Sequence, residues 1–143
     1  MNQPSNNFLT AVLKNKCPRC RQGNLFLNKN PYKLKDGLLM HEKCLVCGQP
    51  TEIEVGFYYG TGYLSYAISF AFLVATMVAW AVIFGLSFKD NSIFEWLITA
   101  CILLVMLQPI LMRLSRTLWL SFFVKYDANW KNNPVDKPER FIK

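Results

Sequence analysis

The sequence contains little of the chemistry that enzymes use. It has one histidine, no nucleophile paired with a general base, and no glycine-rich loop of the kind that cradles phosphate. These absences leave no group of residues that would carry out a reaction. We therefore expect a protein that is not an enzyme and that has no small-molecule substrate.

Charged side chains are missing from a long stretch of the chain. None occurs between Glu54 and Lys89, and within that interval residues 63–88 are apolar enough to cross a hydrocarbon layer of about 30 Å. A small soluble domain has no use for an apolar stretch of this length. The stretch predicts a first transmembrane helix.

A second apolar stretch follows after a short polar connection. Ser92, with Glu95 three residues later, has the spacing of a capping box, so we expect a helix to start near Ile93. Its uncharged part, residues 96–112, has the minimum length for a span, and Pro109 predicts a kink near the far end. Beyond the proline, the pattern allows either a continued helix or a bend into the membrane interface.

Two sets of side chains give the predicted hairpin distinct surfaces. Arg113 and Arg116 follow the second span one turn apart, and we expect them at the membrane interface, in contact with lipid or with carboxylates. The first span carries small residues at every fourth position. Alanine is common in such helices, but this spacing also makes a face on which another helix can dock: Ala67, Ala71, Ala75 and Ala79.

Four of the five cysteines form two Cys-x-x-Cys pairs: Cys17, Cys20, Cys44 and Cys47. Two such pairs can supply the tetrahedral four-sulfur site that zinc prefers, and a small polar domain needs metal to offset its chain entropy. We therefore expect one structural Zn²⁺. Iron fits the same cage, and a Cys-x-x-Cys pair can also carry out thiol exchange, but zinc is favoured over both.

The remaining metal-binding side chains have simpler interpretations. His41 lies three residues before Cys44, but with four cysteines available we expect it to be an ordinary surface histidine. Cys101 falls inside the second span, where we expect a small buried thiol.

Short segments between and after the cysteine pairs predict strands. Residues 24–28, 38–42 and 51–55 are bounded by turn-forming residues, and the last segment alternates polar and apolar side chains. Two cysteine turns on a small antiparallel sheet make a zinc ribbon. A short helix before it carries an apolar stripe that can rest on the membrane surface or on the ribbon: Phe8, Leu9, Val12 and Leu13.

The predicted fold is thus a small zinc ribbon joined to an α-helical transmembrane hairpin. Its expected parts are a short amphipathic N-terminal helix (1–15), a cytoplasmic zinc ribbon (16–56), a two-helix transmembrane hairpin with an interfacial end (57–126) and a polar C-terminal tail (127–143).

Basic residues predict the orientation of this hairpin. They lie before the first span and after the second, whereas the connection between the spans carries Lys89 alone, so the positive-inside rule places both termini in the cytoplasm. The first fifteen residues lack the apolar core of a cleavable signal, which agrees with an N-terminus that stays inside. Cysteines on that side stay reduced, which favours metal over disulfides.

The order of these features resembles a bacterial family described as domain of unknown function 983. The resemblance covers roughly residues 17–126 and differs at Arg21, where the family usually has glycine, and in a longer segment between the cysteine pairs. It implies a small inner-membrane protein with no assigned reaction, some of whose relatives are encoded near functions in terminal oxidase assembly. The residues that carry it are Cys17-Pro18-Arg19-Cys20, Gly23 with Leu25-Phe26, and Cys44 to Gly48, followed by two apolar spans.

We expect the chain to act as an accessory subunit or assembly factor of a larger inner-membrane complex, because a rigid metal domain beside an alanine-faced hairpin suits docking to other membrane subunits. A terminal oxidase is the most specific candidate, and only the family resemblance points to it. The alternatives are a tethered ribbon that binds nucleic acid or anionic lipid, and a thiol redox or metal-handling protein. Nucleic acid is disfavoured, because basic residues beside a span attract anionic lipid headgroups in any case.

Overall fold

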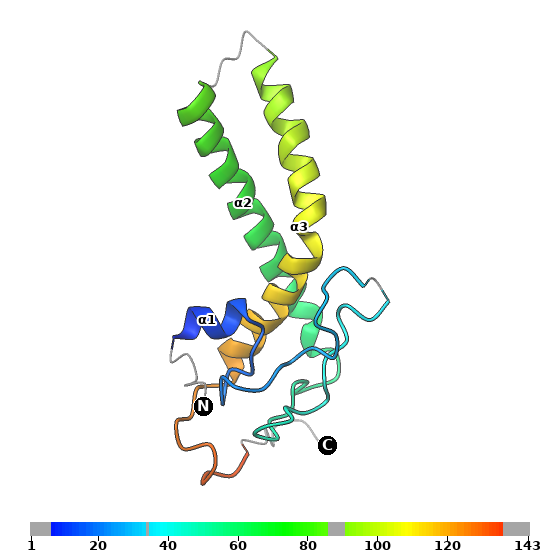
Figure 1. Cartoon of the computed structure of the whole chain (residues 1–143), viewed down its shortest axis with the longest axis vertical. Helices are drawn as coiled ribbons and strands as arrows, with labels where there is room; N and C mark the ends of the chain where they lie inside the picture. Colours follow the sequence, from blue (N-terminus) through cyan, green and yellow to red (C-terminus); the bar gives the residue numbers. More distant parts are fainter. Residues whose placement is uncertain (1–6, 34, 86–90, 136–143) are drawn as a thin grey trace.

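The computed structural model describes residues 7–33, 35–85 and 91–135. Two long helices, α2 (Thr61–Phe84) and α3 (Ser92–Phe123), stand beside each other as a hairpin above a globular end (Figure 1). A short helix, α1 (Phe8–Leu13), lies across the base of the hairpin, and a 3₁₀ turn, η1 (Phe57–Gly60), leads into α2. The globular end is otherwise built of loops and turns.

Helix α2 is uncharged along its 24 residues, which correspond to about 36 Å. It starts two residues before the predicted span and ends at Phe84, where Gly85 takes a φ of 76° that only glycine adopts without strain. The end of the predicted span, at residues 86–88, lies outside the described residues. No side chain of α2 is fully buried within the protein, so much of its apolar surface needs another cover.

Helix α3 continues through Pro109 to Phe123, a total of 32 residues. Of the two paths that the sequence allows after the proline, the structure therefore has the continued helix. Figure 1 shows α3 changing direction in its yellow-to-gold part, as the loss of one backbone hydrogen bond at a proline predicts.

The start of α3 was predicted to within one residue, but for the wrong reason. Asn91 is the N-cap and makes no side-chain capping bond, so the expected capping box is not formed. The hydroxyl of Ser92 instead accepts a hydrogen bond from the indole Nε1 of Trp80, at 3.3 Å. This bond joins α3 to α2 at the end of the hairpin far from the globular part.

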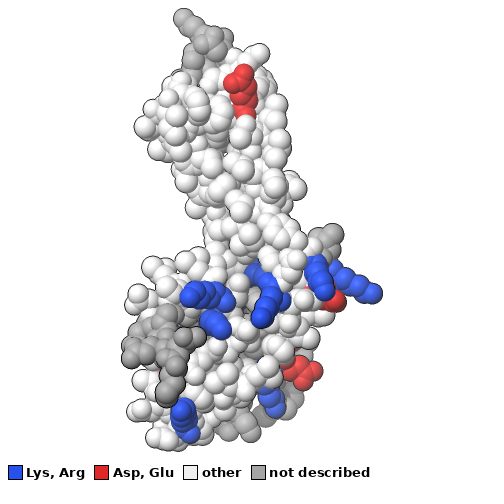
Figure 2. Space-filling view, in the orientation of Figure 1, with Lys and Arg blue, Asp and Glu red and all other residues white. Residues whose placement is uncertain are grey.

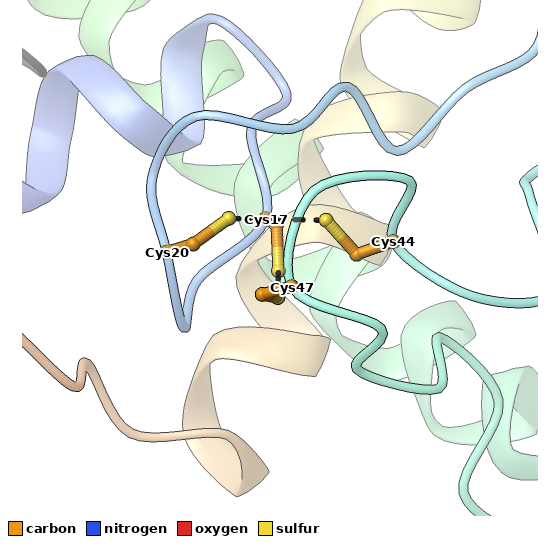
Figure 3. Close-up of side chains that lie close together, drawn as sticks. All are labelled: Cys17, Cys20, Cys44 and Cys47. Atoms are coloured by element: carbon orange, nitrogen blue, oxygen red, sulfur yellow. Dashed lines mark hydrogen bonds between the residues drawn. The ribbon is translucent and has the colours of Figure 1, made fainter. Parts of the chain in front are cut away.

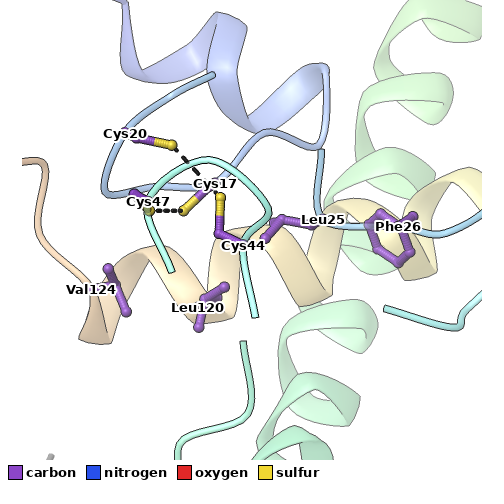
Figure 4. Packing of buried hydrophobic residues seen from close by; sticks show 8 residues of the cluster. All are labelled: Cys17, Cys20, Leu25, Phe26, Cys44, Cys47, Leu120 and Val124. Carbon is purple, nitrogen blue, oxygen red and sulfur yellow. Dashed lines mark hydrogen bonds between the residues drawn. The ribbon is translucent and has the colours of Figure 1, made fainter. Parts of the chain in front are cut away.

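The lower part of α3 belongs to the core of the globular end. Leu120 and Val124 are buried in one cluster with Leu25, Phe26 and the four paired cysteines (Figure 4). The segment that was expected to be an interfacial end of the hairpin is therefore also a wall of the cysteine domain. Because α3 contributes to this shared core, the packing of the cysteine domain also fixes the orientation of α3.

Helix α1 packs on α3 through only part of its apolar stripe. Ala11 and Val12 are buried, whereas Phe8, Leu9 and Leu13 are exposed. Asn15, just after α1, accepts a hydrogen bond from the hydroxyl of Thr117 on α3 at 2.9 Å. The stripe is thus divided between packing on the protein and an exposed face.

The expected ribbon sheet is not confirmed. In the described residues the strand pairing is limited to isolated bridges, of which Phe26 with Met40 joins the first two predicted segments. Two backbone hydrogen bonds flank this bridge, from Leu27 N to Leu39 O at 3.0 Å and from His41 N to Leu25 O at 2.9 Å. The two segments lie antiparallel as a ribbon requires, but they pair over a very short length.

Candidate metal centre

The four paired cysteines bring their sulfur atoms together (Figure 3). The Sγ atoms of Cys17 and Cys47 are 3.7 Å apart, those of Cys20 and Cys44 are 3.8 Å apart, and all four lie within 4.8 Å of one another. A tetrahedral site with Zn–S bonds of about 2.3 Å has sulfurs ~3.8 Å apart, whereas a disulfide bond is about 2.05 Å long. The spacing therefore fits four ligands around one metal ion.

Both cysteine pairs use the same backbone turn. In each, the residue after the second cysteine donates its N–H to the carbonyl of the first: Arg21 to Cys17 at 2.7 Å and Gly48 to Cys44 at 2.9 Å. Both donors have positive φ, 54° for Arg21 and 72° for Gly48. The turn explains why glycine suits this position and identifies Arg21 as the residue that adopts the left-handed conformation at a steric cost.

Gly23 allows the two turns to approach each other. A Cβ at this position would overlap with the Sγ of Cys44 and lie 3.4 Å from the side chain of Val46. Any larger residue would therefore displace a metal ligand. Gly23 was noted in the sequence only as part of a family pattern, and its contact with the other turn could not be read from local spacing.

The cluster is buried, and its thiols differ in acidity. The thiol of Cys17 hydrogen-bonds with its cysteine neighbours, Cys20 first, which raises the pKa of Cys17, while the same contact with Cys17 lowers the pKa of Cys20. Four sulfurs this close cannot all be thiolates without a cation, because their charges repel. A divalent ion would remove the repulsion and displace the remaining protons.

A four-sulfur cage has no open coordination position. Catalytic zinc sites keep a position for water or substrate, whereas closed sites of this composition are structural. When bound, such a metal would therefore stabilise the folded domain and would not take part in a reaction. His41 lies outside the cluster, as expected, and its backbone carbonyl accepts a hydrogen bond from Thr51 Oγ1.

Arg19 connects the first cysteine turn to the C-terminal segment. Its guanidinium is 4 % exposed and donates from Nη2 to the carbonyls of Asn133 at 3.0 Å and Pro134 at 2.8 Å. Asp127 lies 3.6 Å from the same nitrogen and donates its backbone N–H to the carbonyl of Arg19 at 3.1 Å. The described part of the expected polar tail is therefore folded onto the metal domain.

Arg113 fastens α3 to the loop between the cysteine pairs. It is 4 % exposed, and its three nitrogens donate to backbone carbonyls: Nε to Gly37 at 2.7 Å, Nη2 to Asn30 at 2.8 Å and Nη1 to Lys29 at 3.2 Å. Its guanidinium also lies 4.8 Å from the ring centroid of Phe26. We expected Arg113 to contact lipid or carboxylates, but the loop folds back on α3 and supplies backbone carbonyls instead.

Arg116 also binds the loop between the cysteine pairs, but through one carbonyl where Arg113 binds three. It donates from Nη1 to the carbonyl of Leu38 at 2.8 Å and lies 5.1 Å from the ring centroid of Tyr58. Earlier in the same loop, the hydroxyl of Tyr32 donates to the carbonyl of Met106 on α3 at 3.0 Å. The short Phe26–Met40 pairing does not extend because the N–H of Leu39 bonds to the carbonyl of Asp36 at 3.3 Å and the N–H of Leu25 to that of Asn15 at 3.2 Å. Further out, Arg113 binds the carbonyls of Lys29 and Gly37, which a longer ladder would use.

The four alanines of the expected docking face are exposed on α2.

Cys101 on α3 is also exposed, so the prediction of a buried thiol was wrong. The reason is that the contact with α2 covers one side of α3 at this depth, where Ala100 is buried and its neighbour Cys101 points away.

No protein-family model matches this chain, and neither a curated protein nor a solved structure shows significant similarity to it.

Proposed function

We propose that the protein is a non-enzymatic membrane protein in which one structural zinc ion holds a docking domain at the membrane surface. The observation that carries this proposal is the shared core, in which Leu120 of α3 and Val124 just after it pack with the cysteine cluster. Closing the cluster with metal therefore also fixes the orientation of the hairpin. Such a rigid connection serves binding and alignment of other subunits.

Membrane insertion is supported by the exposure of the hairpin. Two helices are long and apolar enough to cross a membrane, and α2 contributes no buried side chain. The core helix of a soluble protein would be buried, and α2 starts far from the N-terminus, unlike a signal sequence. Exposed Phe70, Val82 and Phe84 would form an aggregation-prone surface in water, whereas lipid covers them at no cost.

The distribution of charge supports a single orientation. On the face shown in Figure 2, Lys and Arg side chains lie on the globular end and at its junction with the hairpin, and the hairpin itself is almost uncharged. By the positive-inside rule this end faces the cytoplasm, and we infer that the chain resides in a bacterial inner membrane with its cysteines in a reducing compartment.

Zinc is the metal that we assign, with iron as the competitor. Reduced, buried thiols in a closed cage suit a permanent structural ion, and thiol exchange would require an accessible sulfur. Binding of nucleic acid receives little support, because Arg19 is buried and Arg21 lies 4.0 Å from the ring centroid of Tyr126. These two basic side chains are therefore engaged within the protein.

The partner that we propose is another set of integral membrane subunits. The alanine face lies exposed on α2, so a neighbouring helix could approach it closely. The resemblance to the family described as domain of unknown function 983 makes a terminal oxidase the most specific candidate. In this role the chain is an accessory subunit or an assembly factor.

The proposal is tested by purifying the tagged full-length chain from its own membranes in a mild detergent and identifying the proteins that accompany it. An unrelated two-span membrane protein with the same tag serves as the control. Enrichment of terminal oxidase subunits over the control is the expected result. Recovery of the chain without any enriched membrane protein would contradict the docking role.

A further inference from the structure

A groove opens between α2 and α3 where they meet the globular end. It has a volume of about 420 Å³, and its walls include the apolar side chains of Leu38 and Met112. Polar side chains line its length: Ser65 and Ser69 from α2, and Gln108 and Arg116 from α3. A groove of this composition is unexpected between two helices that are otherwise apolar.

The hydroxyl and amide groups of the groove's side chains are available for hydrogen bonds with a ligand. Elsewhere in the hairpin, Thr76 donates to the carbonyl of Leu73 at 2.9 Å and Thr99 to that of Glu95 at 2.8 Å. Among the described residues, the side chains of Ser65, Ser69 and Gln108 make no such bond. Polar groups inside a hydrocarbon layer are unfavourable without hydrogen-bond partners. A ligand with hydrogen-bond acceptors would supply these partners in the groove.

Arg116 is held at the mouth of this groove. Its Nη1 donates to the carbonyl of Leu38, and its guanidinium carbon lies 5.1 Å from the ring centroid of Tyr58. Within the part of the chain that the structure describes, Nε and Nη2 of Arg116 donate to no acceptor. The groove is therefore lined by a cation that is held in place and has two nitrogens available to an anionic ligand.

The polar groups follow one another in a defined order along the helices. Arg116 lies nearest the globular end, Ser65 follows about a turn above the start of α2, and Ser69 and Gln108 come next. Gln108 precedes Arg116 by eight residues, which is about 12 Å of helix. A phospholipid has the same order: an anionic phosphate, then ester carbonyls that accept hydrogen bonds, then apolar chains.

We propose that this groove binds one anionic phospholipid, with the phosphate at Arg116 and the ester carbonyls at Ser65, Ser69 and Gln108. The acyl chains would extend along the exposed apolar surface of the hairpin. A free phosphate ion would satisfy Arg116 and leave the inner donors unpartnered, so the lipid is the better fit. The inference rests on the proposed membrane insertion of the hairpin.

The test uses the full-length protein, purified in detergent, briefly delipidated and offered phosphatidylglycerol or phosphatidylcholine. Native mass spectrometry then counts the lipids retained per chain. We expect one bound phosphatidylglycerol in the wild type and weaker retention of phosphatidylcholine. Arg116→Gln should lower phosphatidylglycerol retention by about fivefold, the effect expected for one basic group at a membrane surface, and abolish the preference for it.

A second variant separates lipid binding from folding. Ser69→Leu fills the groove but leaves the bond from Arg116 to Leu38 intact, so it should lower retention of both lipids while the metal content stays unchanged. Val78→Leu, at an exposed position of α2, is the matched control and should retain lipid like the wild type. Equal retention by the wild type, Arg116→Gln and Ser69→Leu would overturn the proposal.

Two further experiments test whether something other than a lipid occupies the groove. Displacement of the lipid by millimolar inorganic phosphate would identify a free anion as the ligand, and a photo-crosslink from position 69 to a protein subunit would assign the groove to a partner helix. Either result overturns the lipid site. Extraction of the chain from membranes by alkaline carbonate would instead contradict membrane insertion, so the two failures are distinguishable.

Discussion

The Cα of Gly23 lies so close to the Sγ of Cys44 that a Cβ at position 23 would overlap with the sulfur. The two residues belong to different cysteine turns, and their contact closes the four-sulfur cluster. The absence of a side chain at Gly23 is thus a condition for the close approach of the two turns.

Gly23→Ala should therefore weaken metal binding. Relief of the overlap requires the two cysteine turns to separate, which we expect to cost about 1–3 kcal/mol of stability and to speed the release of zinc to a colorimetric chelator. Gly62→Ala is the matched control, because a Cβ there meets no atom within 4 Å. Equal rates of zinc release from the two variants would show that the close approach does not matter.

The two arginines at the base of α3 should differ in their importance for stability. Arg113→Gln leaves three backbone carbonyls without their charged donor and should lower the free energy of unfolding by about 3 kcal/mol. Arg116→Gln loses one such bond and should cost about 1 kcal/mol. Thermal unfolding in detergent measures both, with the exposed Lys125→Gln as the control. Equal effects of the two substitutions would contradict the assignment of Arg113 as the main attachment of the loop.

Orientation in the membrane is tested with single reporter cysteines. An impermeant thiol reagent added outside the cell should label a cysteine at Asn91 and miss one at Asn30 or Asn132, because the basic flanks stay inside. The experiment should use a Cys101→Ala background, because Cys101 is exposed. Labelling at position 30 would invert the orientation and place the paired cysteines in an oxidising compartment.

The alanine face is tested by adding bulk to it. Replacing Ala71 and Ala75 together with Leu should keep a docked helix at a distance and reduce co-purification of the partner, without loss of membrane targeting or zinc. Val78→Leu adds a methylene at an exposed position of the same helix and should leave co-purification unchanged. If both variants recover as much partner as the wild type, the stripe is ordinary helix composition and docking occurs elsewhere.

The cysteine cluster and the two apolar helices were predictable because both follow from local sequence. Cys-x-x-Cys spacing places two sulfurs on one turn, and uncharged stretches of this length have few structural uses. The left-handed conformation of Arg21 was not predicted, although Gly48 at the same position of the second turn carries a signal for it.

The ribbon sheet and the attachment of the tail could not be predicted in the same way. Local patterns at 24–28 and 38–42 indicated strands, but carbonyls beside these segments are bound by Arg113 and Arg116, which lie far away in the sequence. Arg19 likewise holds carbonyls more than a hundred positions later. Such contacts depend on the tertiary fold, and no periodicity of the chain encodes them.

The metal content of the purified full-length protein decides whether the four paired cysteines form a metal site. Elemental analysis combined with native mass spectrometry should find one zinc ion per chain, and Cys44→Ser should lose the metal, because three thiolates no longer form a closed cage. A metal-free wild type with two disulfide bonds, or a full equivalent of zinc retained by Cys44→Ser, would show that the four cysteines do not form a closed zinc site.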